Sequence, residues 1–313
     1  MNIWLTVLLF ILGIILTVKG GDWFVDAASW IAEVFGIPKF VVGATIVSLA
    51  TTLPEMLVST LAAGQGKVDM AIGNAVGSVT ANTAMILALA LMFMPIVFHR
   101  RASWRQSALL IAAAAVLWLA SLTGTFALWG SVALLLIFAL YIWENLRNAR
   151  SASNNTETRT VATKKEKLEN GLKFLVGAAA IVGGSQLLVN SGSDLAAYFG
   201  VPERVIALTL VAIGTSLPEL VTTITAIVKK QSSLSVGNII GANTIDLTLI
   251  LPLCAVINGG TLPVSAQSVA IDLPVCLAVL LIALIPLLWR ERGSKVQGGL
   301  LLAAYVGYMV MVL

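Results

Sequence analysis

The chain is poor in charge: only 11% of its 313 residues are Asp, Glu, Lys or Arg, whereas 58% are hydrophobic. Soluble domains carry roughly 25% charged residues, so the composition excludes an ordinary soluble domain. Apolar runs of about 20 residues recur from end to end, and each is long enough to cross the hydrocarbon core of a bilayer as a helix. The composition therefore predicts an all-α polytopic membrane protein.

Cysteine and histidine are almost absent as well. Cys254 and Cys276 each lie in an apolar run, which argues against a disulfide framework or a zinc site. The single histidine, His99, lies in a basic loop, so an intramembrane metalloprotease or serine protease lacks its essential residue. An aspartyl protease needs two facing membrane aspartates, but Asp246 has only Asn82 as its counterpart. We expect a protein that is not an enzyme and carries no cofactor.

The apolar runs between polar breaks predict ten transmembrane helices. They are expected at 3–33, 38–64, 69–94, 103–122, 126–147, 171–198, 203–229, 233–257, 267–289 and 296–313. One long polar stretch, rich in Ser, Thr, Asn and charge, separates the fifth helix from the sixth. The predicted organisation is a first five-helix unit at 1–147, a linker at 148–170 and a second five-helix unit at 171–313.

The basic residues support this helix count and give an orientation. When the loops alternate between two sides, sixteen Lys and Arg residues fall on the side of the linker, and only Lys67 and Arg204 fall on the other. The positive-inside rule makes the linker cytoplasmic and both termini external, as in a multi-pass protein of the cell's inner (plasma) membrane. The net charge of +4 is thereby explained by cytoplasmic loops, without a nucleic-acid partner. The oligomeric state is left open.

The sequence repeats itself at an offset of 164 residues. FGIPKFVVGATIVSLATTLPE (35–55) aligns without a gap on FGVPERVIALTLVAIGTSLPE (199–219), and GNAVGSVTAN (73–82) aligns on GNIIGANTID (237–246). Each unit has an odd number of predicted spans, so the two copies must be inverted relative to one another in the membrane. Inverted repeats are typical of secondary transporters, whose binding sites lie at the midplane where the repeats meet.

The repeated residues predict a cation site. Glu55 and Glu219 lie mid-span, where an uncompensated charge costs at least about 2.5 kcal/mol. The prolines just before them each remove a backbone hydrogen bond, which frees carbonyl groups in the preceding turn. The freed carbonyls are expected near Ser48, Ala50 and Thr51 and near Ala212, Gly214 and Thr215, and hydroxyls lie one turn away at Thr51, Thr52, Thr215 and Ser216. Oxygen ligands without sulfur or imidazole suit calcium or sodium.

The third and eighth helices add Ser78 and Asn82, which share a helix face, and Asp246, the repeat counterpart of Asn82. Two carboxylates about 4 Å apart at an effective dielectric of about 20 repel by roughly 4 kcal/mol, so an empty site should take up protons or rearrange. One divalent ion, or several sodium ions, would neutralise both glutamates. This equivalence predicts exchange of one ion for the other.

The chain resembles the calcium/cation antiporter superfamily, and among its members the prokaryotic sodium/calcium exchangers. The resemblance rests on ATTLPE (50–55) and GTSLPE (214–219), which match the family's G-T-S-L-P-E element, and on GNAVGSV (73–79) and GNIIGAN (237–243), which match G-N-x-x-G-S-N. It implies that the first and sixth helices slide across the core to switch access. It also implies a secondary active antiporter that exchanges calcium for sodium by alternating access.

The resemblance also implies roles for the site residues. Glu55 and Glu219 would be the central calcium carboxylates, with carbonyls of Thr51 and Thr215 completing that site. The implied flanking sodium ligands are Thr51, Thr52, Ser78 and the Ser48 carbonyl on one side, and Thr215, Ser216 and the Ala212 carbonyl on the other. Asn82 and Asp246 would flank the middle, with Asp246 a candidate for protonation.

One departure from the family pattern leaves the coupling ion open. Ala242 stands where the second copy of the element often carries a serine, so one flanking sodium site loses an oxygen. Exchange of calcium, or another divalent cation, for protons is therefore the alternative, and a cation channel is a further rival. A requirement for a counter-ion gradient would separate an antiporter from a channel.

Overall fold

The computed structural model describes residues 3–93, 96, 98, 100–155, 162–200 and 214–312, with the backbone alone at 101, 102 and 153–155. The regular secondary structure of this part of the chain is helical except for two short strands. Within it, eight helices have the length and composition to cross a membrane, and a ninth span results if one bent pair is counted together. The chain is therefore a multi-span membrane protein, as its composition predicts.

The helices follow one another with short connections. The first part of the chain forms α1 (Ile3–Phe35), α2 (Lys39–Val42), η1 (Gly43–Val47), α3 (Ser48–Thr51), α4 (Leu53–Gly64), α5 (Val68–Ala81), η2 (Asn82–Leu87), α6 (Ala88–Phe93), α7 (Arg100–Ser121), β1 (Thr125–Phe126) and α8 (Leu128–Asn155). The second part forms α9 (Lys164–Tyr198), α12 (Leu217–Val228), α13 (Ser232–Ile245), η4 (Asp246–Ile250), α14 (Leu251–Ile257), β2 (Leu262–Pro263), η5 (Ser268–Asp272), α15 (Leu273–Arg290) and α16 (Lys295–Val312). The segments named η are π-helical turns within longer helices.

Two helices extend into the stretch predicted as a linker. α8 continues to Asn155, and α9 begins already at Lys164. The start of α9 is fixed by a capping box, in which the Thr163 hydroxyl accepts a hydrogen bond from the Glu166 backbone N–H and the Glu166 side chain accepts one from the Thr163 backbone. An ion pair between Lys173 and Glu169, with 2.8 Å between its atoms, supports the next turn. Part of the polar stretch is therefore helical, where the sequence predicted a linker.

Helix boundaries recur at the same offset as the sequence repeat. α4 and α12 begin at Leu53 and Leu217, and the wide turns η2 and η4 begin at Asn82 and Asp246, so both pairs are 164 residues apart. π-Helical turns occur often at functional sites. The recurrence of such a turn at both candidate ligands shows that the repeat extends to the backbone.

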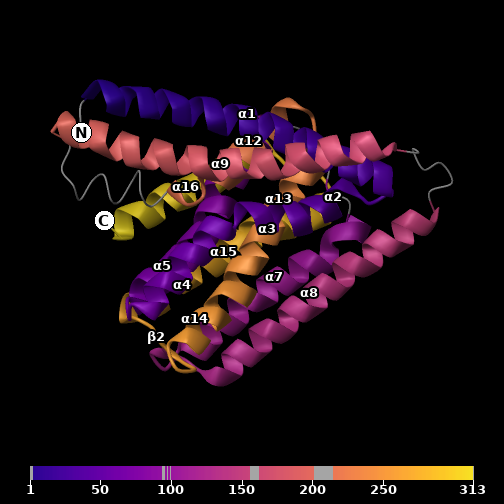
Figure 1. Cartoon of the computed structure of the whole chain (residues 1–313). Helices are drawn as coiled ribbons and strands as arrows, with labels where there is room; N and C mark the ends of the chain where they lie inside the picture. The colour runs from indigo at the N-terminus through magenta and orange to yellow at the C-terminus, as the bar shows by residue number, and fades with distance from the viewer. Residues whose placement is uncertain are drawn as a thin grey trace.

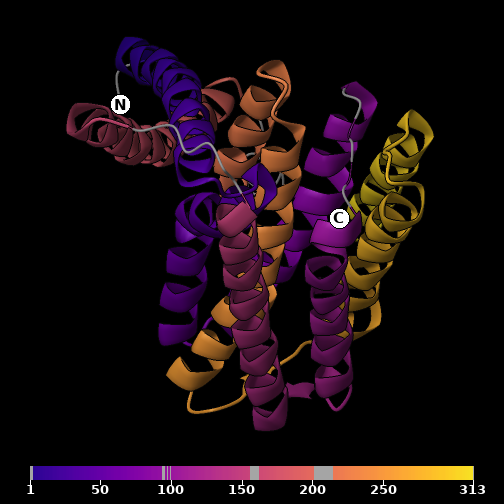
Figure 2. The ribbon, with the colours of Figure 1, turned by 90° about the vertical axis from the view of Figure 1, so that its right-hand side faces the viewer.

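α1 and α9 lie side by side along one edge of the bundle (Figure 1) and are tilted relative to the other long helices (Figure 2). Four glycines bring the two backbones together. A Cβ added at Gly13 would lie 3.0 Å from the Gly184 carbonyl oxygen, and one added at Gly20 would lie 2.9 Å from the Gly177 carbonyl oxygen. Small residues permit such close approach between membrane helices. Gly13 and Gly177 are 164 residues apart, and so are Gly20 and Gly184. Gly13 therefore contacts the repeat counterpart of Gly20, and Gly20 contacts the repeat counterpart of Gly13.

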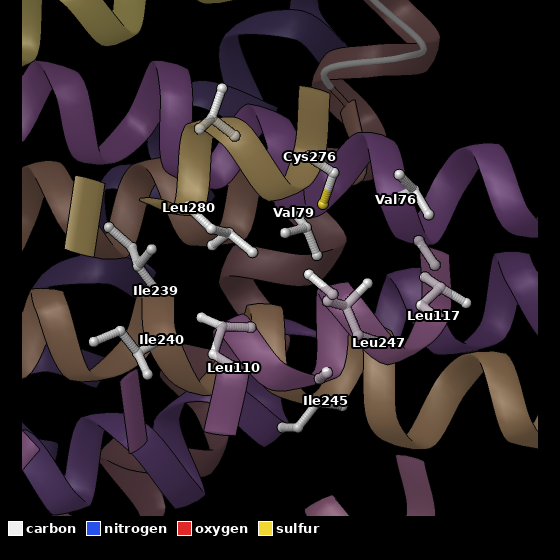
Figure 3. Packing of buried hydrophobic residues seen from close by; sticks show 14 of the residues in the cluster. Val76, Val79, Leu110, Leu117, Ile239, Ile240, Ile245, Leu247, Cys276 and Leu280 are labelled. Atoms are coloured by element: carbon white, nitrogen blue, oxygen red, sulfur yellow. The ribbon is translucent and has the colours of Figure 1, made fainter. Parts of the chain in front are cut away.

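The remaining helices enclose an apolar core. Val79 of α5, Leu247 of η4 and Cys276 of α15 meet in its centre (Figure 3), and all three are at most 1% exposed. α13 crosses the α2–α3 segment so closely that Gly237 has no room for a Cβ beside the Phe40 carbonyl. The paired strands β1 and β2 link α7–α8 to the α14–α15 connection. This core holds α4, α5, α12 and α13 in place around the candidate site.

Candidate cation-binding site

Two helix breaks position the glutamates. The axis of the α2–α3 segment and that of α4 differ by 47°, and the break lies at Thr52, whose backbone has φ −84° and ψ 0°. Ser216, just before α12, has nearly the same backbone angles, φ −85° and ψ 6°. Pro54 lacks an N–H, so it cannot bond the Ala50 carbonyl four residues back. Each break starts a new helix that carries a glutamate in its first turn. Unpaired N–H groups there favour a negative charge.

Among the described residues, five of the six carboxylate oxygens of the site are buried without a hydrogen-bond donor. The side chains of Glu55, Glu219 and Asp246 are all 0% exposed. Both oxygens of Glu55 and of Asp246, and one oxygen of Glu219, have no hydrogen-bond partner in the described part of the chain. The charge of Glu55 interacts with those of both Glu219 and Asp246. Buried acceptors without donors are costly, so these carboxylates are electrostatically suited to a positive ion.

Hydrogen bonds across the two copies of the repeat define the walls of the site. The Thr52 hydroxyl donates to Glu219 Oε1 at 3.4 Å. The Thr51 hydroxyl donates to Asn238 Oδ1 at 3.2 Å, and the Thr215 hydroxyl donates to Asn74 Oδ1 at 3.4 Å. These contacts bring the predicted residues Thr51, Thr52 and Thr215 to the glutamates from opposite copies of the repeat.

The Asn82 amide is held by a residue outside the predicted ligand set, Asn243. Asn82 Nδ2 donates to Asn243 Oδ1 at 3.1 Å, and Asn243 in turn donates to the Thr83 hydroxyl at 2.8 Å. Asn82 Oδ1 has no partner among the described residues, nor have the Asp246 oxygens. Asn243 thus orients the Asn82 amide so that its oxygen is available as a ligand, while Asp246 supplies the charge.

The other predicted ligands have different surroundings. Ser78 is 4% exposed on α5, and Ser216 is 1% exposed with no partner for its hydroxyl in the described chain. Of the carbonyls expected to be freed, that of Ser48 is not, because it accepts the Thr52 backbone N–H at 2.9 Å, whereas that of Ala50 is the one that Pro54 leaves without its usual backbone N–H. Ala212 lies outside the described residues.

Two asparagines outside the predicted ligand set also contact the site. Asn74 and Asn238 each accept a hydrogen bond from a threonine hydroxyl of the other copy of the repeat. Asn74 also donates to the Glu55 carbonyl at 3.3 Å and to the Ser59 hydroxyl at 2.9 Å. The signal that could have identified them is their identical position in the two G-N elements.

The described His, Cys, Asp and Glu side chains form no cluster of three that could hold a metal ion unaided. Hydroxyl, amide and backbone oxygens would have to complete the coordination shell. Calcium takes six to eight oxygen ligands and accepts such neutral oxygens readily. The donor set, made of carboxylate, amide and hydroxyl oxygens, fits a hard cation rather than zinc or copper.

The chain is similar to known membrane proteins, several of which are named as exchangers. The model of the family described as sodium/calcium exchanger protein matches residues 5–146 and 171–313. The inner membrane protein YrbG of Escherichia coli is 33% identical over 312 residues, covering 97% of this chain and 95% of that protein. The sodium/calcium exchanger MaX1 of Methanosarcina acetivorans is 28% identical over 342 residues, which cover 97% of each chain.

A solved structure of the sodium-calcium exchanger NCX_Mj, soaked with zero Na⁺ and Ca²⁺, superposes with a TM-score of 0.85 at 27% identity, over 99% of this chain and 100% of that one. The fold and the sequence motifs therefore lead to the same group of transporters, whose members are antiporters of calcium and other cations rather than enzymes. The chain belongs to the sodium/calcium exchanger protein family.

Proposed function

We propose that the chain is a secondary active antiporter that exchanges calcium for sodium across the plasma membrane by alternating access. The single observation that carries the proposal is the group of five carboxylate oxygens, from Glu55, Glu219 and Asp246, that are buried without donors. Such a group needs a cation, and a transported ion can supply the charge in each half of the cycle. The names of MaX1 and NCX_Mj support calcium and sodium as the two ions.

The architecture we propose is ten membrane helices in two inverted five-helix units, 1–147 and 171–313, joined by a cytoplasmic segment at 148–170, with both termini outside. The recurrence of helix starts, wide turns and glycine contacts at an offset of 164 residues supports a pseudo-two-fold arrangement. Inverted repeats provide alternating access because each unit can adopt the conformation of the other.

In the proposed site, calcium binds between Glu55 and Glu219. The ligand set, proposed as a whole, comprises Glu55, Glu219, Thr51, Thr215, Thr52, Ser216, Ser78, Asn82, Asp246, Ser48 and Ala212. The contact between Thr52 and Glu219, at 3.4 Å, supports a site shared by the two units. Sodium ions would bind to the flanking hydroxyl groups, and their positive charges would take the place of the charge of calcium.

One observation favours a second candidate, exchange of calcium or another divalent cation for protons. Ala242, the counterpart of Ser78, is 0% exposed and brings no hydroxyl to the second unit. Asp246 offers a carboxylate that could carry a proton in place of the missing sodium ligand. Both candidates share the calcium site and differ only in the coupling ion.

Flux measurements separate these candidates. Purified protein in liposomes would be tested for calcium-45 uptake driven by an outward sodium gradient and, separately, by an outward proton gradient, with the membrane potential clamped. Uptake with sodium alone supports sodium/calcium exchange, whereas uptake with protons alone overturns it in favour of proton coupling. Uptake without any counter-gradient would overturn antiport and indicate a channel.

A further inference from the structure

A groove far from the glutamates lies between α7 and α15, near the first residues of α7 and the last residues of α15. It has a volume of about 340 Å³ and is lined by Arg100, Trp104, Ile285, Leu288 and Trp289. None of these residues belongs to the ligand set proposed for the ion site. Leu110 and Leu280, on the same two helices, belong to the buried core and do not line the groove.

The side chains change from apolar to charged along the length of the groove. Ile285 and Leu288 come first along α15, Trp289 follows, and the helix ends at Arg290. α7 begins at Arg100 and reaches Trp104 one turn later, so its charged residue also lies at the outer end. Aliphatic, indole and guanidinium groups in this order match the depth profile of a membrane interface, where Trp and Tyr occupy the headgroup level.

The charge of the groove is uncompensated. Arg105, beside Trp104, pairs with the buried Glu144 at 2.8 Å, so its charge is already neutralised. Arg100 has no such carboxylate partner within the residues that the structure describes, and no acidic residue lines the groove. Arg105 also packs over the Trp104 ring at 5.3 Å, which orients that indole. A guanidinium without a carboxylate, at the headgroup level, is suited to a phosphate group.

We propose that this groove binds one anionic phospholipid. Its phosphate would contact Arg100, its glycerol region would lie against Trp104 and Trp289, and one acyl chain would follow Ile285 and Leu288. A basic pocket between membrane helices on the cytoplasmic side is a recurrent way to select anionic headgroups. The proposal does not depend on which counter-ion the transporter uses, because the groove is separate from the ion site.

Native mass spectrometry of the detergent-purified chain would measure the first bound lipid, with phosphatidylglycerol and phosphatidylcholine of identical acyl chains as probes. Wild type should bind phosphatidylglycerol about fivefold more tightly, and Arg100→Gln should remove that preference, since one basic residue contributes about that factor. The matched control is Arg150→Gln, because Arg150 is an exposed arginine on α8 that does not line the groove.

A second variant changes the shape of the groove without changing its charge. Leu288→Trp should fill the groove and weaken binding of both lipids, while the melting temperature without added lipid shows that the variant is folded. Equal binding of the two lipids by wild type would overturn the proposal, because it would indicate unselective boundary lipid. Equal losses in Arg100→Gln and Arg150→Gln would also overturn it, because they would indicate diffuse surface charge.

Discussion

Thr51 donates a hydrogen bond to Asn238, and Thr215, its counterpart 164 residues later, makes the same contact with Asn74. The two bonds measure 3.2 Å and 3.4 Å and link the residues just before each helix break to the glycine-rich helix of the other copy of the repeat. They fix the distance between the broken helices, and hence the position of the glutamate that follows each break.

Replacing either asparagine with alanine should therefore lower calcium affinity. Asn74→Ala removes the acceptor for Thr215 and the donors to Ser59 and to the Glu55 carbonyl, and an unsatisfied buried polar group costs about 1–3 kcal/mol. We expect calcium affinity to fall about tenfold, measured by titration calorimetry. Asn258→Ala is the control, since Asn258 donates only within an exposed loop. An affinity that stays unchanged in both site variants would contradict the assigned positioning role.

Asp246→Asn should stabilise the calcium-free protein. Three mutually repelling carboxylates surround the proposed site, and neutralising one removes up to about 4 kcal/mol of repulsion if two lie about 4 Å apart. The thermal unfolding midpoint without calcium should rise by a few degrees, and the further rise on adding calcium should become smaller. Asp69→Asn, at the exposed start of α5, should leave the calcium-dependent rise intact. A lower midpoint without calcium would argue against a repulsive cluster.

Ala242→Ser should strengthen competition by sodium. The substitution restores an oxygen at the position equivalent to Ser78, inside the buried part of α13. The sodium concentration that half-inhibits calcium binding should fall several-fold. Ala255→Ser adds a hydroxyl at another buried alanine, on α14 and away from the proposed ligands, and should leave sodium competition unchanged. Identical sodium inhibition in wild type and Ala242→Ser would place the coupling ion elsewhere.

Gly20→Ala should destabilise the contact between α1 and α9. A Cβ at Gly20 would lie 2.8 Å from the Ala180 Cβ and 2.9 Å from a carbonyl oxygen, so the helices would have to separate. At Gly299 on α16 nothing lies within 4 Å of an added Cβ, and alanine favours a helix over glycine by about 1 kcal/mol. Thermal unfolding should therefore shift down for Gly20→Ala and stay level or shift up for Gly299→Ala. Similar shifts in both variants would contradict close packing of α1 on α9.

Much of this architecture could be predicted from the sequence because the bilayer requires long apolar helices and the repeat is exact in register. The expected helix 233–257 corresponds to α13 through α14, Ser232–Ile257, and Pro54 and Pro218 mark breaks that the structure contains. The extent of α8 and α9 was underestimated, because a polar helix above the membrane has no apolar signal and depends on local pairs such as Lys173 and Glu169.

The central residues of the site were predictable for a similar reason, since Glu55 and Glu219 are charges in places where only function retains them. Their surroundings were not. The local geometry of the helix decides which carbonyl a proline frees, and the Ser48 carbonyl still accepts a backbone N–H. The partners of Asn74, Asn82 and Asn238 lie far away in the sequence, and only the packed helices bring them together.

The central claim is that Glu55 and Glu219 hold the transported calcium. The most direct measurement is calcium-45 uptake into liposomes containing Glu55→Gln or Glu219→Gln, with Glu169→Gln, an exposed glutamate on α9, as the control. Each site variant should lose transport while the control retains it, because glutamine removes the charge and preserves the size. Substantial calcium flux through either site variant would contradict the account.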